Sequence, residues 1–238
     1  MILRWLAKRR LGRRLLRHHL PLGLVTGLAG FLLYVAHPQL NIIERLSFAS
    51  AYPALILIST TLLIGPIKLL SGKRVPISMD LRRDIGIWAG VAGVSHALVG
   101  QFVHLRGRPW LYYVYDNWTG AHLLPIRHDV FGLANDTGLL AALMLLLLLA
   151  TSNDASLRKL RTPGWKKLQR WNYACFGFVA IHTFLYQEAL ESQTLPFLSL
   201  ALITVGFTTF IQYRGFRLRT ALSHAAVREA SAPTTGPG

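Results

Sequence analysis

The apolar residues of this 238-residue chain are gathered in long blocks rather than alternating with polar ones. Six blocks reach the roughly 17 to 25 residues that a helix needs to cross a hydrocarbon core about 30 Å thick. The pattern therefore predicts an all-α integral membrane protein built as a bundle of six transmembrane helices. We place the spans at Leu20–His37, Ala49–Leu70, Asp84–His104, Gly132–Thr151, Trp171–Gln187 and Leu195–Tyr213.

The first block follows a basic segment, which is also the order of a secretory signal. The apolar region of a signal runs about 7 to 15 residues and ends at small residues, whereas this block runs about eighteen. It ends in the sequence Tyr34–Pro38, which offers no such cleavage site. We therefore expect the first block to be a retained span.

Basic residues outnumber acidic ones, with 26 Lys and Arg against 10 Asp and Glu, and they lie in the gaps between blocks. The gaps on one side and the two ends of the chain carry 21 of them, whereas the opposite gaps hold only Arg45, Arg106, Arg108 and Arg127. Short cytoplasmic segments are enriched in Lys and Arg, so both termini are predicted to be cytoplasmic (N-in, C-in). The net charge of +16 is therefore better explained by a topology signal than by binding of nucleic acid. Membrane lipid is the expected neighbour of the chain.

The predicted organisation has three parts: a basic cytoplasmic N-terminus at 1–19, a membrane domain at 20–213 and a cytoplasmic tail at 214–238. After Arg219 the tail turns to Ala, Ser, Thr, Pro and Gly, which predicts disorder. On the outer side the long connection at 105–131 holds five Trp and Tyr residues together with His122 and His128. This composition is typical of an amphipathic segment anchored among the lipid headgroups, with a substrate site as the alternative.

Two histidines lie well inside predicted spans, His96 in the third and His182 in the fifth. Ionisable groups are rare inside a bilayer, so each is a functional candidate, the alternative being a histidine satisfied by a neighbouring carbonyl. Both spans run from the cytoplasm outward. His96 follows Asp84 by 12 residues and His182 follows Trp171 by 11, which places both about 17 Å from the cytoplasmic edge. At equal depth they could face each other across the bundle.

Two imidazoles at one depth limit what such a site could bind. The single cysteine, Cys175, lies inside an apolar block and carboxylates are missing nearby, which argues against a zinc or di-iron site. A haem held by two imidazoles is then the natural occupant. Gly93 and Gly100 share the helix face of His96, where they would admit a flat ring or allow close helix packing.

A set of residues between the third and fifth spans matches a known pattern: Leu81–Trp88, Ser95–His96, Gly138, Thr151–Ser152, Arg158–Leu160, Trp165–Leu168, Tyr173 and Ile181–His182. Through these positions residues 80–187 resemble the ferric-reductase-like transmembrane domain family and, within it, the MsrQ group of haem-binding membrane subunits. The resemblance implies a b-type haem between His96 and His182 in a multi-pass protein of the bacterial inner membrane. It also implies electron transfer from a cytoplasmic flavin reductase or the quinone pool to an outer-side redox protein, a periplasmic molybdenum-cofactor methionine sulfoxide reductase.

The chain departs from this family at one position. Relatives usually carry a further histidine thirteen residues before the ligand of the fifth span, where this chain has Gln169, and the same step back from His96 reaches Arg83. Neither side chain normally ligates haem iron, so one haem per chain is predicted. Arg83 could still meet a haem carboxylate or a quinone. His104, eight residues beyond His96, is a candidate for contact with a haem carboxylate, a quinone or a second iron, or else an interfacial histidine in water.

Two functions remain in view. The first is a membrane oxidoreductase subunit that carries electrons through a b-type haem. Because the cytoplasmic gaps are short and hold no Gly-rich phosphate loop, its electrons would come from a separate donor. The alternative is a cofactor-free membrane scaffold or small transporter whose histidines pair with backbone or line a proton path.

Overall fold

A computed structural model describes residues 11–72, 78–116, 124–190 and 195–231, and within these ranges the chain is all-helical, without strands. A lone antiparallel bridge joins Val114 and Ile126. The elements, in chain order, are η1 (Leu15–His19), α2 (Leu20–Val35), α3 (Ile42–Leu70), α4 (Met79–Gly100), η2 (Leu105–Gly107), η3 (Pro109–Tyr112), α5 (Val130–Ala150), α6 (Asp154–Gln169), α7 (Trp171–Leu190) and α8 (Leu195–Ser231). η1 is a π-helical turn, and η2 and η3 are 3-10 turns.

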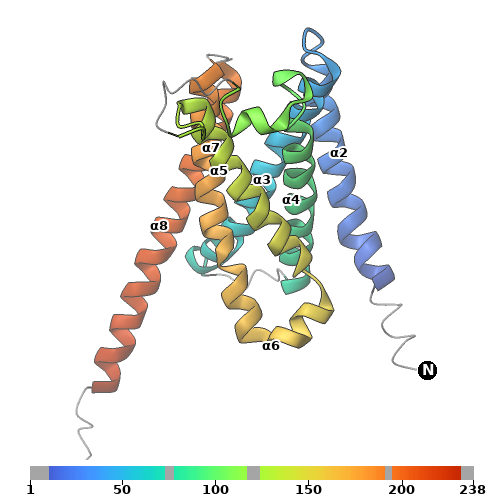
Figure 1. Ribbon diagram of the computed structural model, residues 1–238. Coiled ribbons are helices and arrows are strands. Elements are labelled where there is room, and N and C mark those ends of the chain that lie inside the picture. Colours follow the sequence, from blue (N-terminus) through green and yellow to red (C-terminus); the bar gives the residue numbers. More distant parts are fainter. Residues whose placement is uncertain (1–10, 73–77, 117–123, 191–194, 232–238) are drawn as a thin grey trace, which may run out of the picture.

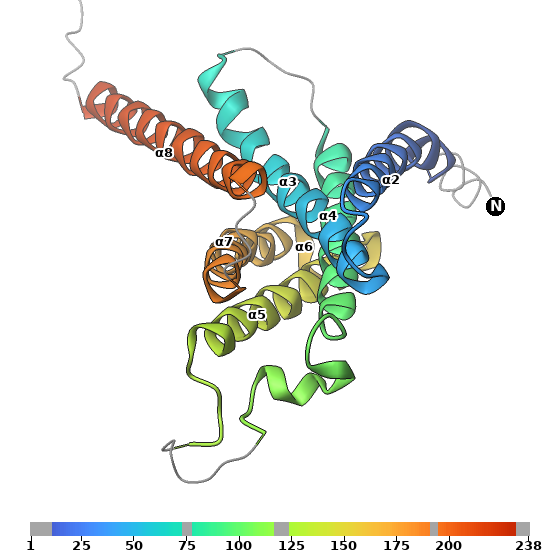
Figure 2. The ribbon, with the colours of Figure 1, turned by 90° about the horizontal axis from the view of Figure 1, so that it is seen from above.

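Helices α3, α4, α5 and α7 form the centre of the molecule, and α2 and α8 lie on opposite flanks of it (Figure 1, Figure 2). α6 lies at one end of this bundle, and η2 and η3 lie at the other (Figure 1). The beginning of η1 and the far end of α8 are both on the side of α6. The ends of the described helical chain therefore share one side of the molecule.

Side-chain caps fix where the central helices begin. Asn41 accepts hydrogen bonds from the backbone N–H groups of Ile43 and Glu44, and the Glu44 carboxylate accepts one from the N–H of Asn41. This reciprocal pair satisfies backbone donors that the first turn of α3 would leave free. Ser78 and Asp129 cap α4 and α5 through a single side-chain oxygen each.

Three helical stretches are long and apolar enough to cross a membrane: Leu11–Val35, Ile42–Leu70 and Val130–Ala150. They contain most of the first, all of the second and most of the fourth predicted spans. The third predicted span overlaps most of α4, the fifth lies within α7, and the sixth is the first half of α8. Large apolar side chains are exposed along them, among them Leu24, Phe31 and Leu143. Surface of this kind is costly in water but natural in lipid. Together these features indicate a membrane protein.

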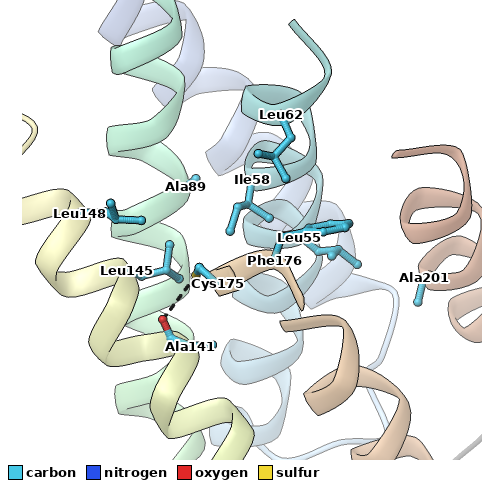
Figure 3. Packing of buried hydrophobic residues seen from close by; sticks show 10 residues of the cluster. All are labelled: Leu55, Ile58, Leu62, Ala89, Ala141, Leu145, Leu148, Cys175, Phe176 and Ala201. Atoms are coloured by element: carbon cyan, nitrogen blue, oxygen red, sulfur yellow. Dashed lines mark hydrogen bonds between the residues drawn. The ribbon is translucent and has the colours of Figure 1, made fainter. Parts of the chain in front are cut away.

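The buried core is one cluster of side chains from five helices, α3, α4, α5, α7 and α8. Leu55, Ile58 and Leu62 of α3 face Ala141, Leu145 and Leu148 of α5, with Ala89, Cys175, Phe176 and Ala201 contributed by α4, α7 and α8 (Figure 3). The Cys175 thiol donates to the carbonyl of Ala141 over 3.5 Å, which ties α7 to α5. The thiol is fully buried and so takes part in packing.

The prediction of disorder after Arg219 is wrong as far as Ser231, because α8 continues to that residue. Ala, Leu and Arg dominate this stretch and favour a helix, and the first proline after Pro196 comes only at position 233. Residues 232–238 lie outside the described part of the chain.

The connections also differ from expectation. The gap at 152–170, which was predicted to be cytoplasmic, contains the helix α6, which bends at Arg161, where φ is 55°. The outer connection, expected as an amphipathic segment, forms the two short turns η2 and η3 followed by an irregular stretch. Trp118 and His122 lie outside the described residues.

Candidate functional site

The structure brings His96 of α4 and His182 of α7 together. The centroids of their rings are 6.1 Å apart, and the ring planes cross at 64°. Protein surrounds both residues, yet each keeps part of its surface accessible. The two imidazoles therefore lie close together within the bundle without being completely packed against it.

Each imidazole is held through its Nδ1 atom by a backbone carbonyl of a neighbouring helix. His96 Nδ1 lies 3.0 Å from the carbonyl oxygen of Ser47 in α3, and His182 Nδ1 lies 2.7 Å from that of Ala134 in α5. A carbonyl can only accept, so Nδ1 carries the proton in both rings. Nε2 is then left with a lone pair, which is the arrangement of a metal-ligating histidine.

Gly138 of α5 leaves room for the His182 ring. A Cβ added at position 138 would lie 2.6 Å from His182 Nδ1 and 2.8 Å from its Cε1, closer than such contacts allow. A glycine one helical turn beyond Ala134 therefore lets the imidazole lie against α5 and reach the Ala134 carbonyl. The resemblance to the haem-binding family included this glycine, but the sequence did not assign it a role.

The two glycines near His96 differ in their surroundings. A Cβ at Gly93 would come within 2.5 Å of Leu145 Cδ1, so Gly93 allows α4 to pack closely on α5. A Cβ at Gly100 would meet nothing within 4 Å. Of the two interpretations of this stripe, helix packing therefore accounts for Gly93, and open space adjoins Gly100.

Aromatic rings extend from the histidine pair toward η3. The ring of Tyr186 lies 5.4 Å from that of His182 and 6.0 Å from that of His104, and Phe131 lies 6.2 Å from both Tyr186 and His104. Tyr112 of η3 stacks on Phe131 at 5.6 Å. The Tyr186 ring therefore lies between the rings of His104 and His182. His104 itself comes four residues after the end of α4.

Tyr112 fastens the outer connection onto the end of α4. Its hydroxyl donates to the carbonyl of Gly100 over 3.0 Å and accepts from the N–H of His104 over 2.8 Å. Burial raises the pKa of Tyr112, so the phenol stays protonated and able to donate. The Arg127 guanidinium in the same region holds the pKa of the Asp129 carboxyl below its ordinary value.

At the opposite end, Arg83 is buried and already paired. Its guanidinium donates to Asp154 over 2.6 Å and lies 3.5 Å from Asp80, so α4 is joined to the start of α6. Gln169, in the last turn of α6, has a buried Nε2 with no hydrogen-bond partner within the described residues. The structure places neither residue against the histidine pair.

A second cluster at this end was not predicted. The fully buried carboxylate of Asp84 is paired with Arg14, with His18 Nδ1 at 2.7 Å and with His19 Nε2 at 3.3 Å. These partners come from the π-helical turn η1 and the residue before it. Two sequence features could have indicated this cluster. Asp84 is an acidic residue at the start of the third predicted span, and His18 and His19 come directly before the first.

The donor set of the histidine pair fits a haem iron. Within the described ranges, no group of three or more His, Cys, Asp or Glu side chains could hold a bare metal ion. Two imidazoles suit a metal whose other ligands come from a macrocycle. Metal–nitrogen bonds are about 2 Å long, so two imidazoles on one metal have ring centroids about 6 Å apart. The observed separation of 6.1 Å agrees with this spacing.

In comparisons with known proteins, no protein-family model matches this chain, and no solved structure matches it significantly.

Proposed function

We propose that this chain is the b-type haem subunit of a membrane oxidoreductase, similar to the MsrQ group, with His96 and His182 as the axial ligands. The observation that supports the proposal most is the pair of imidazoles 6.1 Å apart, each with Nδ1 bonded to a carbonyl. A bound haem supplies one-electron chemistry at its iron. The chain itself orients the two rings and keeps them in a low-dielectric interior.

The proposed setting is a six-span, N-in, C-in bundle in a bacterial inner membrane. Its support is the shared side of α6 and the two described chain ends, together with the Lys and Arg bias toward that side (Figure 1). Electrons would enter there from a cytoplasmic flavin reductase or from quinol. They would leave on the side of η2 and η3 to an outer redox protein.

The spectrum of the purified protein tests the ligand assignment. Wild-type protein is expected to show a low-spin b-type spectrum with one haem per chain, because Gln169 and Arg83 stand where relatives can hold a second iron centre. Replacing His96 or His182 by Ala removes an axial ligand and should abolish that spectrum while the chain still inserts into the membrane.

The matched control is His37→Ala. His37 is also a buried histidine with Nδ1 on a carbonyl, that of Leu33 at 2.9 Å, but it lies outside the pair. Its variant should keep the wild-type spectrum. Wild-type protein without a Soret band would instead favour the cofactor-free scaffold or transporter, and full haem retention in both ligand variants would refute the assignment.

A further inference from the structure

The His104 side chain has a buried polar atom that the rest of the described chain leaves unsatisfied. Its Nε2 is inaccessible and has no hydrogen-bond partner among the residues that the structure describes. A buried nitrogen without a partner loses its hydration and gains nothing in return, so such atoms are rare in native proteins. The position of His104 therefore points to a group that the described part of the chain does not supply.

The backbone around His104 is held in a specific conformation. Its N–H donates to the Tyr112 hydroxyl, which is itself fixed on the carbonyl of Gly100. The next residue, Leu105, has a φ of 59°, in the left-handed region that L-residues other than Asn and Asp rarely adopt. Strain of this kind persists where surrounding contacts enforce it and is common at ligand sites.

The place of His104 relative to the histidine pair is given by Tyr186. The Tyr186 ring contacts the His182 ring on one side and the His104 ring on the other, at 5.4 and 6.0 Å. His104 therefore lies next to the proposed haem site, on the side of η3. It is a neighbour of the site rather than a third member of the pair.

We propose that His104 donates a hydrogen bond from Nε2 to a carboxylate of the bound haem, an inference that rests on the proposed function. A haem brings carboxylates into a low-dielectric interior, where a charged oxygen requires a donor. Guanidinium groups described on the side of η3 already have other partners: Arg45 donates to the Tyr34 carbonyl, Arg108 pairs with Asp116 and Arg127 pairs with Asp129. His104 thus orients the haem with its carboxylate edge toward η3 and acts as a positioning residue.

The test compares two cofactors in two proteins. Haem-free wild-type protein and His104→Phe are reconstituted in detergent with haem or with haem dimethyl ester, whose carboxylates are blocked, and both affinities are measured by the Soret absorbance. The variant keeps a ring against Tyr186 but has no donor. We expect His104→Phe to lower haem affinity about tenfold or more and to leave the affinity for the ester nearly unchanged.

The control variant is His128→Phe, an exposed histidine of the same outer region whose Nδ1 contacts the Ile126 carbonyl; it should change neither affinity. An equal loss for both cofactors in His104→Phe would show a packing role and overturn the proposal. No loss for either would overturn it as well, since Nε2 would then be satisfied by water. A wild-type protein that forms no low-spin complex with either cofactor would instead refute the proposed function.

Discussion

Individual residues fix the geometry of the histidine pair, and Gly138 has the tightest contact with it. The His182 ring occupies the volume that any side chain at position 138 would need. The same ring reaches the Ala134 carbonyl one turn earlier, so a shift away from α5 would also break that hydrogen bond. The orientation of one proposed ligand therefore depends on the absence of a single methyl group.

Gly138→Ala is expected to displace the His182 ring. Disturbing the partners that orient a metal-bound histidine typically costs about 10 to 100-fold in affinity, so haem content should fall and part of the low-spin spectrum should be lost. The measurement is haem per chain with the absorption spectrum of the oxidised protein.

Gly206→Ala on α8 is the matched control, because a Cβ there would meet nothing within 4 Å. It should retain all the haem and be neutral or more stable by about 0.5 to 1 kcal/mol, the usual gain of Ala over Gly inside a helix. Equal spectra for the two alanine variants would contradict the role given to Gly138.

The sequence predicted the depth of His96 and His182 because both follow span starts by nearly the same number of residues. It did not predict the ion pair of Arg83 with Asp154, because the two residues are 71 positions apart in the chain. Asp154 also begins α6, a helix that the hydrophobic pattern did not predict. It left His104 open between a site residue and an interfacial histidine. The Tyr112 contact, which bears on this choice, depends on the fold of η3 and could not be derived from residue spacing.

At the scale of elements, the N-terminal helix is attached to α4 by charge. Asp84 is completely buried, and its three partners all come from the two turns before α2. α2 itself packs mainly on α3 rather than on α4, although a Cβ at Gly23 would touch Trp88. The ion cluster therefore sets the position of the N-terminal helix along α4.

Asp84→Asn should loosen this attachment. Removing one partner of a buried ion pair leaves the others uncompensated and typically costs about 3 to 5 kcal/mol, so the unfolding temperature in detergent should fall clearly. Limited proteolysis should also cut sooner near Arg13 and Arg17.

Asp116→Asn is the comparison, since the Arg108–Asp116 pair is exposed on both sides and exposed pairs contribute about 1 kcal/mol or less. A similar loss of stability in the two variants would show that the Asp84 cluster has no special part in attaching the N-terminal helix.

Element boundaries followed from hydrophobicity where lipid or core decides them, as in α5, α7 and the C-terminal end of α3. The start of α3 was placed at Ala49, whereas the Asn41 cap begins the helix at Ile42. α6 was missed because its residues are polar and basic, and its helix depends on the Asn153 cap and on the pairing of Arg83 with Asp154. The helical end of α8 was not predicted, because the Ala, Ser, Thr, Pro and Gly residues after Arg219 have a composition typical of disorder. Helix propensity over Phe216–Val227 would have indicated the continuation.

At the scale of the whole molecule, the distribution of charge and the arrangement of helices point to the same orientation. α6 and both described chain ends lie on one side (Figure 1). The gaps predicted to be cytoplasmic, which carry most of the Lys and Arg residues, belong to that side. The turns η2 and η3 lie on the other. The orientation matters because it sets the direction of electron flow in the proposed function.

Thiol labelling of intact cells can test this orientation with little background, because Cys175 is the single cysteine and is buried. A membrane-impermeant maleimide should react with Leu124→Cys, on the outer connection, and should spare Thr162→Cys in α6 until the cells are opened. Both positions are exposed, so accessibility does not differ between them. The opposite labelling pattern would invert the topology.

The π-helical turn η1 has a consequence for how the N-terminus tolerates change in length. A π turn holds about one residue more than an α turn, as though a single residue had been inserted into a regular helix. Deleting one residue from Leu15–His19 would turn the wide turn into an ordinary α turn, and the residues before it would keep nearly the same angular position relative to α2. Arg14 would then still lie on the side of Asp84, whereas a deletion within the regular helix α2 would rotate it away by about 100°. The wide turn therefore works as a length buffer, at which one residue can be lost without turning the charged segment away from its partner.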